Sequence, residues 1–152
     1  MPPVIHLNGL AIAAAAASTI VIGFLWYGPL FGSAWMQEMG MPPDFKPDPA
    51  VLKRSMLLMI AGAVLTAIVL ACGIEICRPF MWQAWQAWKA GDGAPPAIVG
   101  LCAALFAWAG FYVPMLLGGV AWESRSWKWF GINAGYHFAA LLAAGMILAY
   151  WR

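Results

Sequence analysis

Apolar residues fill four long stretches of this chain, and charged residues lie almost only between them. No Asp, Glu, Lys or Arg occurs between His6 and Gln37 or in residues 55–74, 93–122 and 129–151. An α-helix of about 20 residues crosses the roughly 30 Å hydrocarbon core of a bilayer. The pattern predicts four transmembrane helices, over about residues 4–30, 53–77, 97–121 and 129–150.

These spans predict an all-α fold, a polytopic membrane protein in which residues 1–152 form one transmembrane domain of two tandem helical hairpins. A backbone in lipid satisfies its own polar groups as helix, which favours this class. Pro79 suits the first turn of a new helix, so a short interfacial helix is expected over about residues 79–90. Its interfacial aromatic residues recur every third position: Trp82, Trp85 and Trp88.

Composition agrees with a membrane environment. The chain is 64% hydrophobic and 9% charged, and its mean hydropathy is +0.78, well outside the usual range of soluble domains. The net charge is only +2, and there is no basic run that could follow a phosphate backbone. The expected partner is therefore the lipid bilayer, and nucleic acid is not expected.

Basic residues predict the orientation, because cytoplasmic loops accumulate Lys and Arg. The first and third connections carry five of them, and the opposite side carries three. This count predicts that both termini lie outside the cytoplasm. The two sets are Lys46, Lys53, Arg54, Arg125 and Lys128, and Arg78, Lys89 and Arg152.

An internal repeat is visible between the two predicted hairpins. GFLWYGPLFGSAW (residues 23–35) aligns without gaps to GFYVPMLLGGVAW (residues 110–122), with six identical positions. Each segment contains a proline, and a lysine-bearing turn and another apolar helix follow both. Duplication would relate the hairpins by an axis along the membrane normal; chance similarity in a Gly- and Trp-rich chain is the alternative.

The segments LWYGPLFGSAWMQEMG (residues 25–40) and GFYVPMLLGGVAWESRSWKWFGINAGYH (residues 110–137) resemble a bacterial family. This is an uncharacterised family of small four-span inner-membrane proteins, classed as a domain of unknown function. The resemblance covers most of the chain and implies a multipass fold in the bacterial inner membrane. It implies no activity, substrate or catalytic residue. The strongest matches are Trp26, Tyr27, Pro29, Phe31, Gly32, Trp35, Met36 and residues 133–137.

Polar residues inside a span are costly and have a partner or a role. Asn133 and His137 are four apart and share one helical face, with Tyr136 beside them. Tyr27 and Tyr112 are expected at the same depth, and Pro29 and Pro114 are expected to break their helices. One hypothesis makes His137 a proton carrier or ligand contact. The alternative is an Asn/His pair bonded to backbone carbonyls freed at the two prolines.

A second candidate cluster lies toward the other side of the membrane. Glu75 precedes Arg78 by three residues, a spacing that favours a local ion pair, and His6 is expected at similar depth. Cys72, Cys77 and Cys102 lack the spacing of a metal site or disulfide framework. We expect no metal or other cofactor.

The chain has no Ser-His-Asp pattern, phosphate loop, HExxH motif or paired buried carboxylates, so an enzyme is not expected. Two functions remain. One is a structural or accessory component that acts by packing, as a homo-oligomer or with another membrane protein, through small residues spaced by four. The other is a small oligomeric transporter or channel for a lipophilic or weakly polar solute. Small residues spaced by four occur at Gly9/Ala13/Ala17, Ala63/Ala67/Ala71, Gly100/Ala104 and Gly131/Gly135.

Overall fold

The computed structural model describes residues 7–42, 44–88 and 94–151, and every regular element in these ranges is helical. Two of the elements, η1 and η2, are π-helical turns inserted between α-helical segments. In chain order the elements are α1 (Gly9–Leu25), η1 (Trp26–Leu30), α2 (Gly32–Glu38), α3 (Pro49–Trp88), α4 (Pro96–Ala107), η2 (Trp108–Tyr112), α5 (Val113–Trp122) and α6 (Trp127–Tyr150).

The predicted all-α membrane fold is confirmed. Four helical stretches are long and apolar enough to cross a membrane: Gly9–Leu30, Pro49–Met81, Pro96–Trp122 and Trp127–Tyr150. Each agrees with one of the spans expected from the uncharged runs. The chain is therefore a multi-pass membrane protein that contacts the lipid bilayer.

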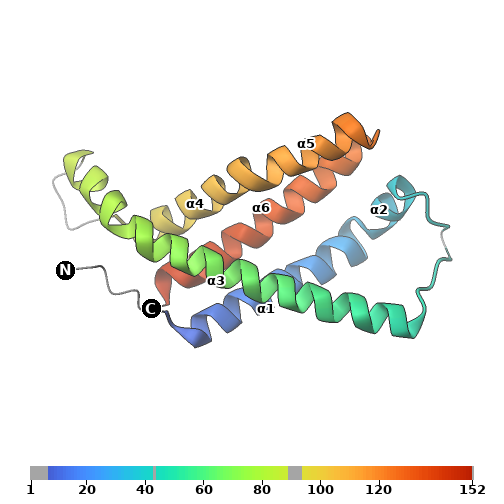
Figure 1. Cartoon of the computed structure of the whole chain (residues 1–152), viewed down its shortest axis with the longest axis horizontal. Helices are drawn as coiled ribbons and strands as arrows, with labels where there is room; N and C mark the ends of the chain where they lie inside the picture. The colour runs from blue at the N-terminus through green and yellow to red at the C-terminus, as the bar shows by residue number, and fades with distance from the viewer. Residues whose placement is uncertain (1–6, 43, 89–93, 152) are drawn as a thin grey trace.

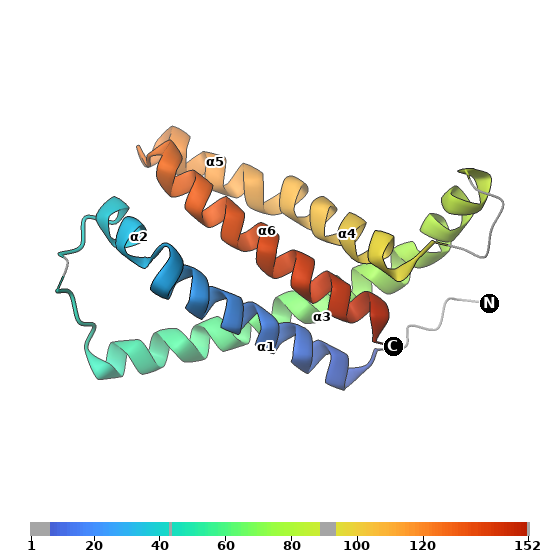
Figure 2. The ribbon, with the colours of Figure 1, turned by 180° about the vertical axis from the view of Figure 1, so that it is seen from behind.

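Helix α6 lies in the middle of the bundle. It packs against α1 on one side and against α4 and α5 on the other, and α3 crosses over this layer (Figures 1 and 2). Helix α1 begins where α6 ends, and the connections α2–α3 and α5–α6 share the opposite end (Figure 1). Both predicted hairpins are thus present, one formed by α1 and α3 and the other by α4, α5 and α6. Helix α6 packs against the first hairpin through α1.

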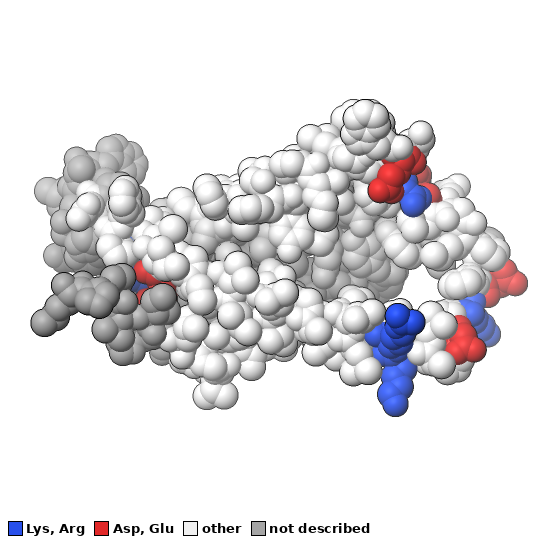
Figure 3. All heavy atoms as spheres, in the orientation of Figure 1, with Lys and Arg blue, Asp and Glu red and all other residues white. Residues whose placement is uncertain are grey.

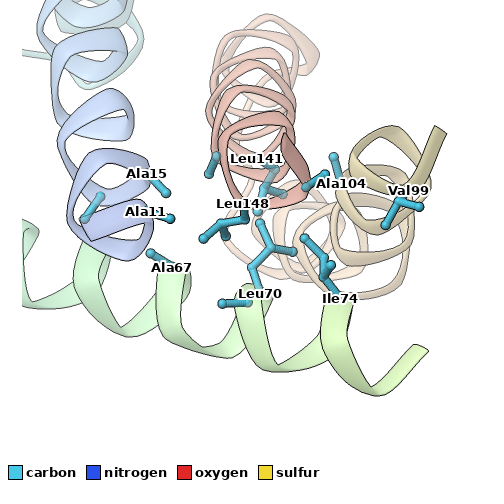
Figure 4. Packing of buried hydrophobic residues seen from close by; sticks show 13 residues of the cluster. Ala11, Ala15, Ala67, Leu70, Ile74, Val99, Ala104, Leu141 and Leu148 are labelled. Atoms are coloured by element: carbon cyan, nitrogen blue, oxygen red, sulfur yellow. The ribbon is translucent and has the colours of Figure 1, made fainter. Parts of the chain in front are cut away.

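Small side chains fill the core where α1, α3, α4 and α6 meet (Figure 4). Without a hydrophobic driving force in lipid, helices associate through close packing, which alanine and glycine allow. The buried cluster contains Ala11, Ala15, Ala16, Ala67, Leu70, Ala71, Ile74, Val99, Ala104, Leu141, Ala144, Leu148 and Ala149.

Helix α3 is continuous through Pro79, so the prediction of a separate helix over residues 79–90 was wrong. Proline removes one backbone bond and crowds the preceding turn, yet here the helix extends on both sides of it. With 40 residues at about 1.5 Å each, α3 is roughly twice as long as the hydrocarbon core is thick. The side chains of Trp82, Trp85 and Trp88 lie outside the described residues.

Charged side chains gather at the two ends of the bundle, and the middle carries none (Figure 3). Lys53 and Arg54 lie near the start of α3, and Glu75 and Arg78 lie in its second half. The apolar stretch between these two pairs has the length that a transmembrane helix needs.

Candidate functional site

The five side chains predicted to form a polar site lie together inside the bundle. Asn133, Tyr136 and His137 project from α6. Tyr27 reaches them from η1 and Tyr112 from η2. Two sequence segments far apart in the chain therefore meet on one face of the central helix.

A hydrogen-bonded chain joins η1 to α6. The Tyr27 hydroxyl donates to Asn133 Oδ1 at 2.8 Å, and the Asn133 side-chain amide donates to the Trp129 carbonyl at 2.8 Å. A polar group buried without a partner in an apolar medium is costly, and these bonds meet that need. The side-chain oxygen and amide of Asn133 thus each have a partner, and the carbonyl that the amide binds lies on its own helix.

Four rings form a continuous row from η1 to η2. The ring centroids of Tyr27 and Tyr136 are 5.0 Å apart, those of Tyr136 and His137 are 4.9 Å apart, and those of His137 and Tyr112 are 4.3 Å apart. The first two distances lie in the usual range of aromatic ring contacts, and the third is slightly shorter. His137 is therefore held between two tyrosines.

Space for Tyr136 comes from a glycine on α1. A Cβ added at Gly23 would lie 3.2 Å from the Tyr136 hydroxyl oxygen. That hydroxyl donates a long bond of 3.4 Å to the Thr19 carbonyl, and the Thr19 hydroxyl donates to the Ala16 carbonyl at 2.8 Å. A larger residue at Gly23 would push Tyr136 out of the row.

Two tryptophans form hydrogen bonds to α6 from both sides. Their place at the site was not predicted from the sequence. Trp26 Nε1 donates to the Ile132 carbonyl at 3.0 Å, and Trp108 Nε1 donates to the Ala134 carbonyl at 2.8 Å. A helical carbonyl has a second lone pair for such a bond. Gly135 leaves room for the Trp26 ring, since a Cβ there would lie 2.9 Å from it. Tryptophan is so common at membrane interfaces that its sequence position gave no signal of this role.

The π-turn η1 contains Pro29, and the first span ends with this turn at Leu30. The Phe31 N–H donates to the Trp26 carbonyl at 2.8 Å, a bond across five residues, and this wider turn contains the proline. A Cβ at Gly32 would lie 2.5 Å from the Tyr27 carbonyl oxygen, so only glycine fits there. The helix thus widens at Pro29 and ends at Leu30, and α2 begins after the non-helical Phe31.

The second π-turn, η2, lies directly before Pro114. The Val113 N–H donates to the Trp108 carbonyl, again across five residues, and Pro114 occupies the first turn of α5. Proline is tolerated there because the N–H that it lacks has no helical partner in a first turn. The helix continues, so the expected break at Pro114 was wrong. Isolated π-turns within α-helices are frequent at functional sites.

A pocket of about 280 Å³ opens beside the ring row, between α1, α3, η2 and α6. Figure 3 shows the surface hollowed between α3 and α5, where the two helices diverge in Figure 1. The lining is mostly apolar, with a few polar groups on its wall. It consists of Thr19, Ile20, Met59, Gly62, Ala63, Thr66, Tyr112, Tyr136, His137, Ala140 and Leu141.

The polar atoms of this pocket are only partly used by the protein. Within residues 7–42, 44–88 and 94–151, the hydrogen bonds leave the His137 ring nitrogens and the hydroxyls of Tyr112 and Thr66 without a protein partner. An imidazole has one donor and one acceptor when neutral, and each hydroxyl can donate once. These groups are available to a molecule in the pocket.

The second candidate cluster forms only the ion pair. Arg78 Nη2 and Nε donate to Glu75 Oε1 at 2.8 and 3.0 Å, the local pair expected from their spacing, whereas His6 lies outside the described residues. Cys72, Cys77 and Cys102 are free thiols. In the described part of the chain, no three His, Cys, Asp or Glu side chains are placed to hold a metal ion.

At the opposite end, a polar cluster ties α2 to the α5–α6 connection. The Ser126 hydroxyl donates to Glu38 Oε2, Lys128 Nζ lies 3.4 Å from Glu38 Oε1, and Arg125 Nη1 lies 3.7 Å from Met39 Sδ. The Ser126 hydrogen bond, assisted by Lys128, lowers the pKa of the Glu38 carboxyl below its ordinary value. No sequence pattern predicts this contact, because its partners belong to different connections.

Comparison with known protein families identifies the chain. One family model, described as protein of unknown function (DUF1761), matches residues 10–149. The chain belongs to the DUF1761 family. Its match covers all four spans and the ring row, in agreement with the resemblance to a family of unknown function. No curated protein and no solved structure gives a significant match.

Proposed function

We propose that this DUF1761 protein is a small carrier that binds a weakly polar, lipophilic solute inside the bilayer. The observation that carries the proposal is the pocket of about 280 Å³ with Tyr112, Tyr136 and His137 on its wall. A concave, mostly apolar site with a few convergent polar groups is typical of small-molecule sites. The role is binding and passage, with no bond made or broken.

The position of the pocket suits a solute that arrives from lipid. Thr66 lies in the middle of the uncharged run Ser55–Ile74, at a depth where only lipid surrounds the helices. The pocket is lined by residues of α1, α3, η2 and α6. A solute dissolved in the hydrocarbon would therefore reach it sideways between helices.

Photolabelling would test the proposal. The probe is a long-chain alcohol that carries a diazirine, and labelled peptides are identified by mass spectrometry. Gly62 lines the pocket and Gly73 does not; a Cβ added at either meets nothing within 4 Å, so both tolerate a larger side chain. Gly62→Leu should fill the pocket and abolish labelling near His137, whereas the control Gly73→Leu should label as the wild type does. Labelling that Gly62→Leu leaves unchanged would overturn the proposal.

The proposed location is the bacterial inner membrane with both termini periplasmic. The family resemblance supports the membrane, and the basic residues support the orientation. The start of α3, with Lys53 and Arg54, shares one end of the bundle with the α5–α6 connection and the start of α6, with Arg125 and Lys128 (Figure 1). Positive charge is enriched in cytoplasmic connections.

A second proposed role is an accessory component, and one observation favours it. Gly9, Ala13 and Ala17 form a small-residue stripe on α1 that is exposed and unused inside the bundle. Such stripes permit close approach of another helix, from a second copy or another membrane protein. Disulfide trapping of an Ala13→Cys variant in native membranes should give a dimer, and an Ile22→Cys control should not. Equal trapping of both variants would contradict this role.

The proposed duplication of the two hairpins has one structural support. Each hairpin contains a π-turn that begins with a tryptophan bonded to α6, at Trp26 and Trp108. The gapless alignment instead pairs Trp26 with Val113. A common origin would thus require a shifted alignment in this region.

A further inference from the structure

The pocket wall combines stacked rings with hydrogen-bond donors, and this combination narrows the class of ligand. The inference rests on the proposed function, because it assigns chemistry to the same pocket. It concerns the wall built by α6 and η2, which carries His137 and Tyr112, together with Thr66 of α3.

Three aromatic rings form one wall of the pocket and offer contacts to another ring. Tyr112 and His137 are 4.3 Å apart between centroids with a tilt of 34°, and Tyr136 follows at 4.9 Å from His137 with a tilt of 57°. All three line the pocket. Aromatic groups prefer offset or tilted contacts at such distances, so a planar ring is favoured over a flexible chain at this wall.

Each available polar group can donate one hydrogen bond, and the hydroxyls and the second His137 nitrogen can also accept one. The hydroxyls of Tyr112 and Thr66 and one ring nitrogen of His137 can each donate a hydrogen bond into the pocket. A ligand with carbonyl oxygens would satisfy these donors, whereas a pure hydrocarbon would leave them unpaired. The Tyr136 hydroxyl, by contrast, already donates to the Thr19 carbonyl.

The α3 wall is apolar apart from Thr66 and suits a tail. Met59 and Ala63 line the pocket from α3, and Gly62 between them leaves the space open. Neighbouring residues of α3, such as Leu58 and Leu65, are exposed to lipid. An apolar tail would leave the pocket along this surface.

We propose that the pocket takes a quinone-like ring, a planar ring with carbonyl oxygens and an apolar tail. The ring lies against Tyr112, His137 and Tyr136, a carbonyl accepts from His137 or Tyr112, and the tail extends past α3 into the bilayer. The assignment concerns binding only; no electron transfer is part of it.

Competition against the diazirine alcohol tests this assignment in the purified full chain. The competitors are 2-methyl-1,4-naphthoquinone and 2-methylnaphthalene, which share a fused-ring skeleton and differ in the carbonyl oxygens. The quinone should compete about fivefold more strongly than the hydrocarbon, which corresponds to one net hydrogen bond. His137→Phe should reduce this preference, and His137→Gln, which keeps an N–H donor, should restore part of it.

The outcomes separate the two proposals. If both competitors act equally on the wild type and on His137→Phe, the ring-carbonyl assignment is overturned while the pocket remains a lipophilic site. If the alcohol itself labels Gly62→Leu as well as the wild type, the proposed function fails. If His137→Phe elutes as aggregate, Tyr112→Phe is used in its place. The assignment is then overturned if Tyr112→Phe and His137→Gln both prefer the quinone over the hydrocarbon as strongly as the wild type does.

Discussion

Gly100 of α4 and Gly145 of α6 touch through their backbones. A Cβ added at Gly100 would lie 2.8 Å from the Gly145 carbonyl oxygen, and one added at Gly145 would lie 2.7 Å from the Gly100 carbonyl oxygen. Such approach is possible only where both residues lack a side chain. This contact sets the spacing of α4 and α6, and with it the position of Trp108 over the site.

Alanine at this contact should therefore destabilise the bundle. We expect Gly100→Ala to cost about 1–3 kcal/mol, because the helices must separate to admit the methyl group. Gly118→Ala is the control, since a Cβ there meets nothing within 4 Å; it should leave stability at or above that of the wild type. Reversible unfolding by SDS in mixed micelles measures both, and equal stability of the two variants would refute the contact.

The two tryptophan bonds to α6 should each contribute to stability. Trp26→Phe and Trp108→Phe remove the Nε1 donors, and we expect each to cost about 0.5–1.5 kcal/mol. Trp122→Phe is a suitable control because Trp122 is 90% exposed. The same unfolding measurement applies, and a loss at Trp122 as large as at Trp26 would argue against specific bonds.

Tyr27 and Asn133 should be energetically coupled. A double-mutant cycle with Tyr27→Phe and Asn133→Leu isolates their 2.8 Å hydrogen bond. We expect a coupling of about 0.6 kcal/mol and at most about 1.7, as measured for similar bonds in membrane proteins. Tyr27→Phe combined with Tyr112→Phe should instead be additive. Additivity in the first pair would mean that the bond is absent in the native protein.

The Glu38 contact should make the α2 end of the bundle sensitive to acid. Because the Ser126 hydrogen bond and Lys128 lower the pKa of the Glu38 carboxyl in the folded protein, its stabilisation is present above the ordinary glutamate pKa. It is lost as the pH falls through the lowered folded value.

Glu38→Gln should flatten this acid-side loss of thermal stability, measured as the melting temperature against pH. Asp48→Asn is the control, since Asp48 caps the start of α3 away from Ser126. If the melting temperature of Glu38→Gln falls at low pH as that of the wild type does, another group causes the acid sensitivity.

The uncharged runs were sufficient to predict the spans, because the bilayer imposes both the length and the composition of a crossing helix. Polar residues within those runs, above all Asn133 and His137, also identified the site, since a polar group in hydrocarbon needs a partner. The partners themselves were only partly predictable: Tyr27 was named, whereas the Trp129 carbonyl was not.

Three features depend on contacts that no local sequence pattern predicts. The π-turns arise from backbone bonds across five residues near prolines, and proline alone suggests a break. Helix α3 continues through Pro79 although proline favours a helix start. The Glu38–Ser126 contact joins residues that are close only after the hairpins have packed.

The central claim is that the chain crosses the bilayer four times, with the α2–α3 and α5–α6 connections on one side. Single cysteines in a variant without the native thiols test it with a membrane-impermeant maleimide. Asp44→Cys and Ser124→Cys should react from the same side, and Leu7→Cys and Pro95→Cys only from the other, which is the outer side of intact cells in the proposed orientation. Labelling of Asp44→Cys and Ser124→Cys from opposite sides would contradict the fold and the site built on it.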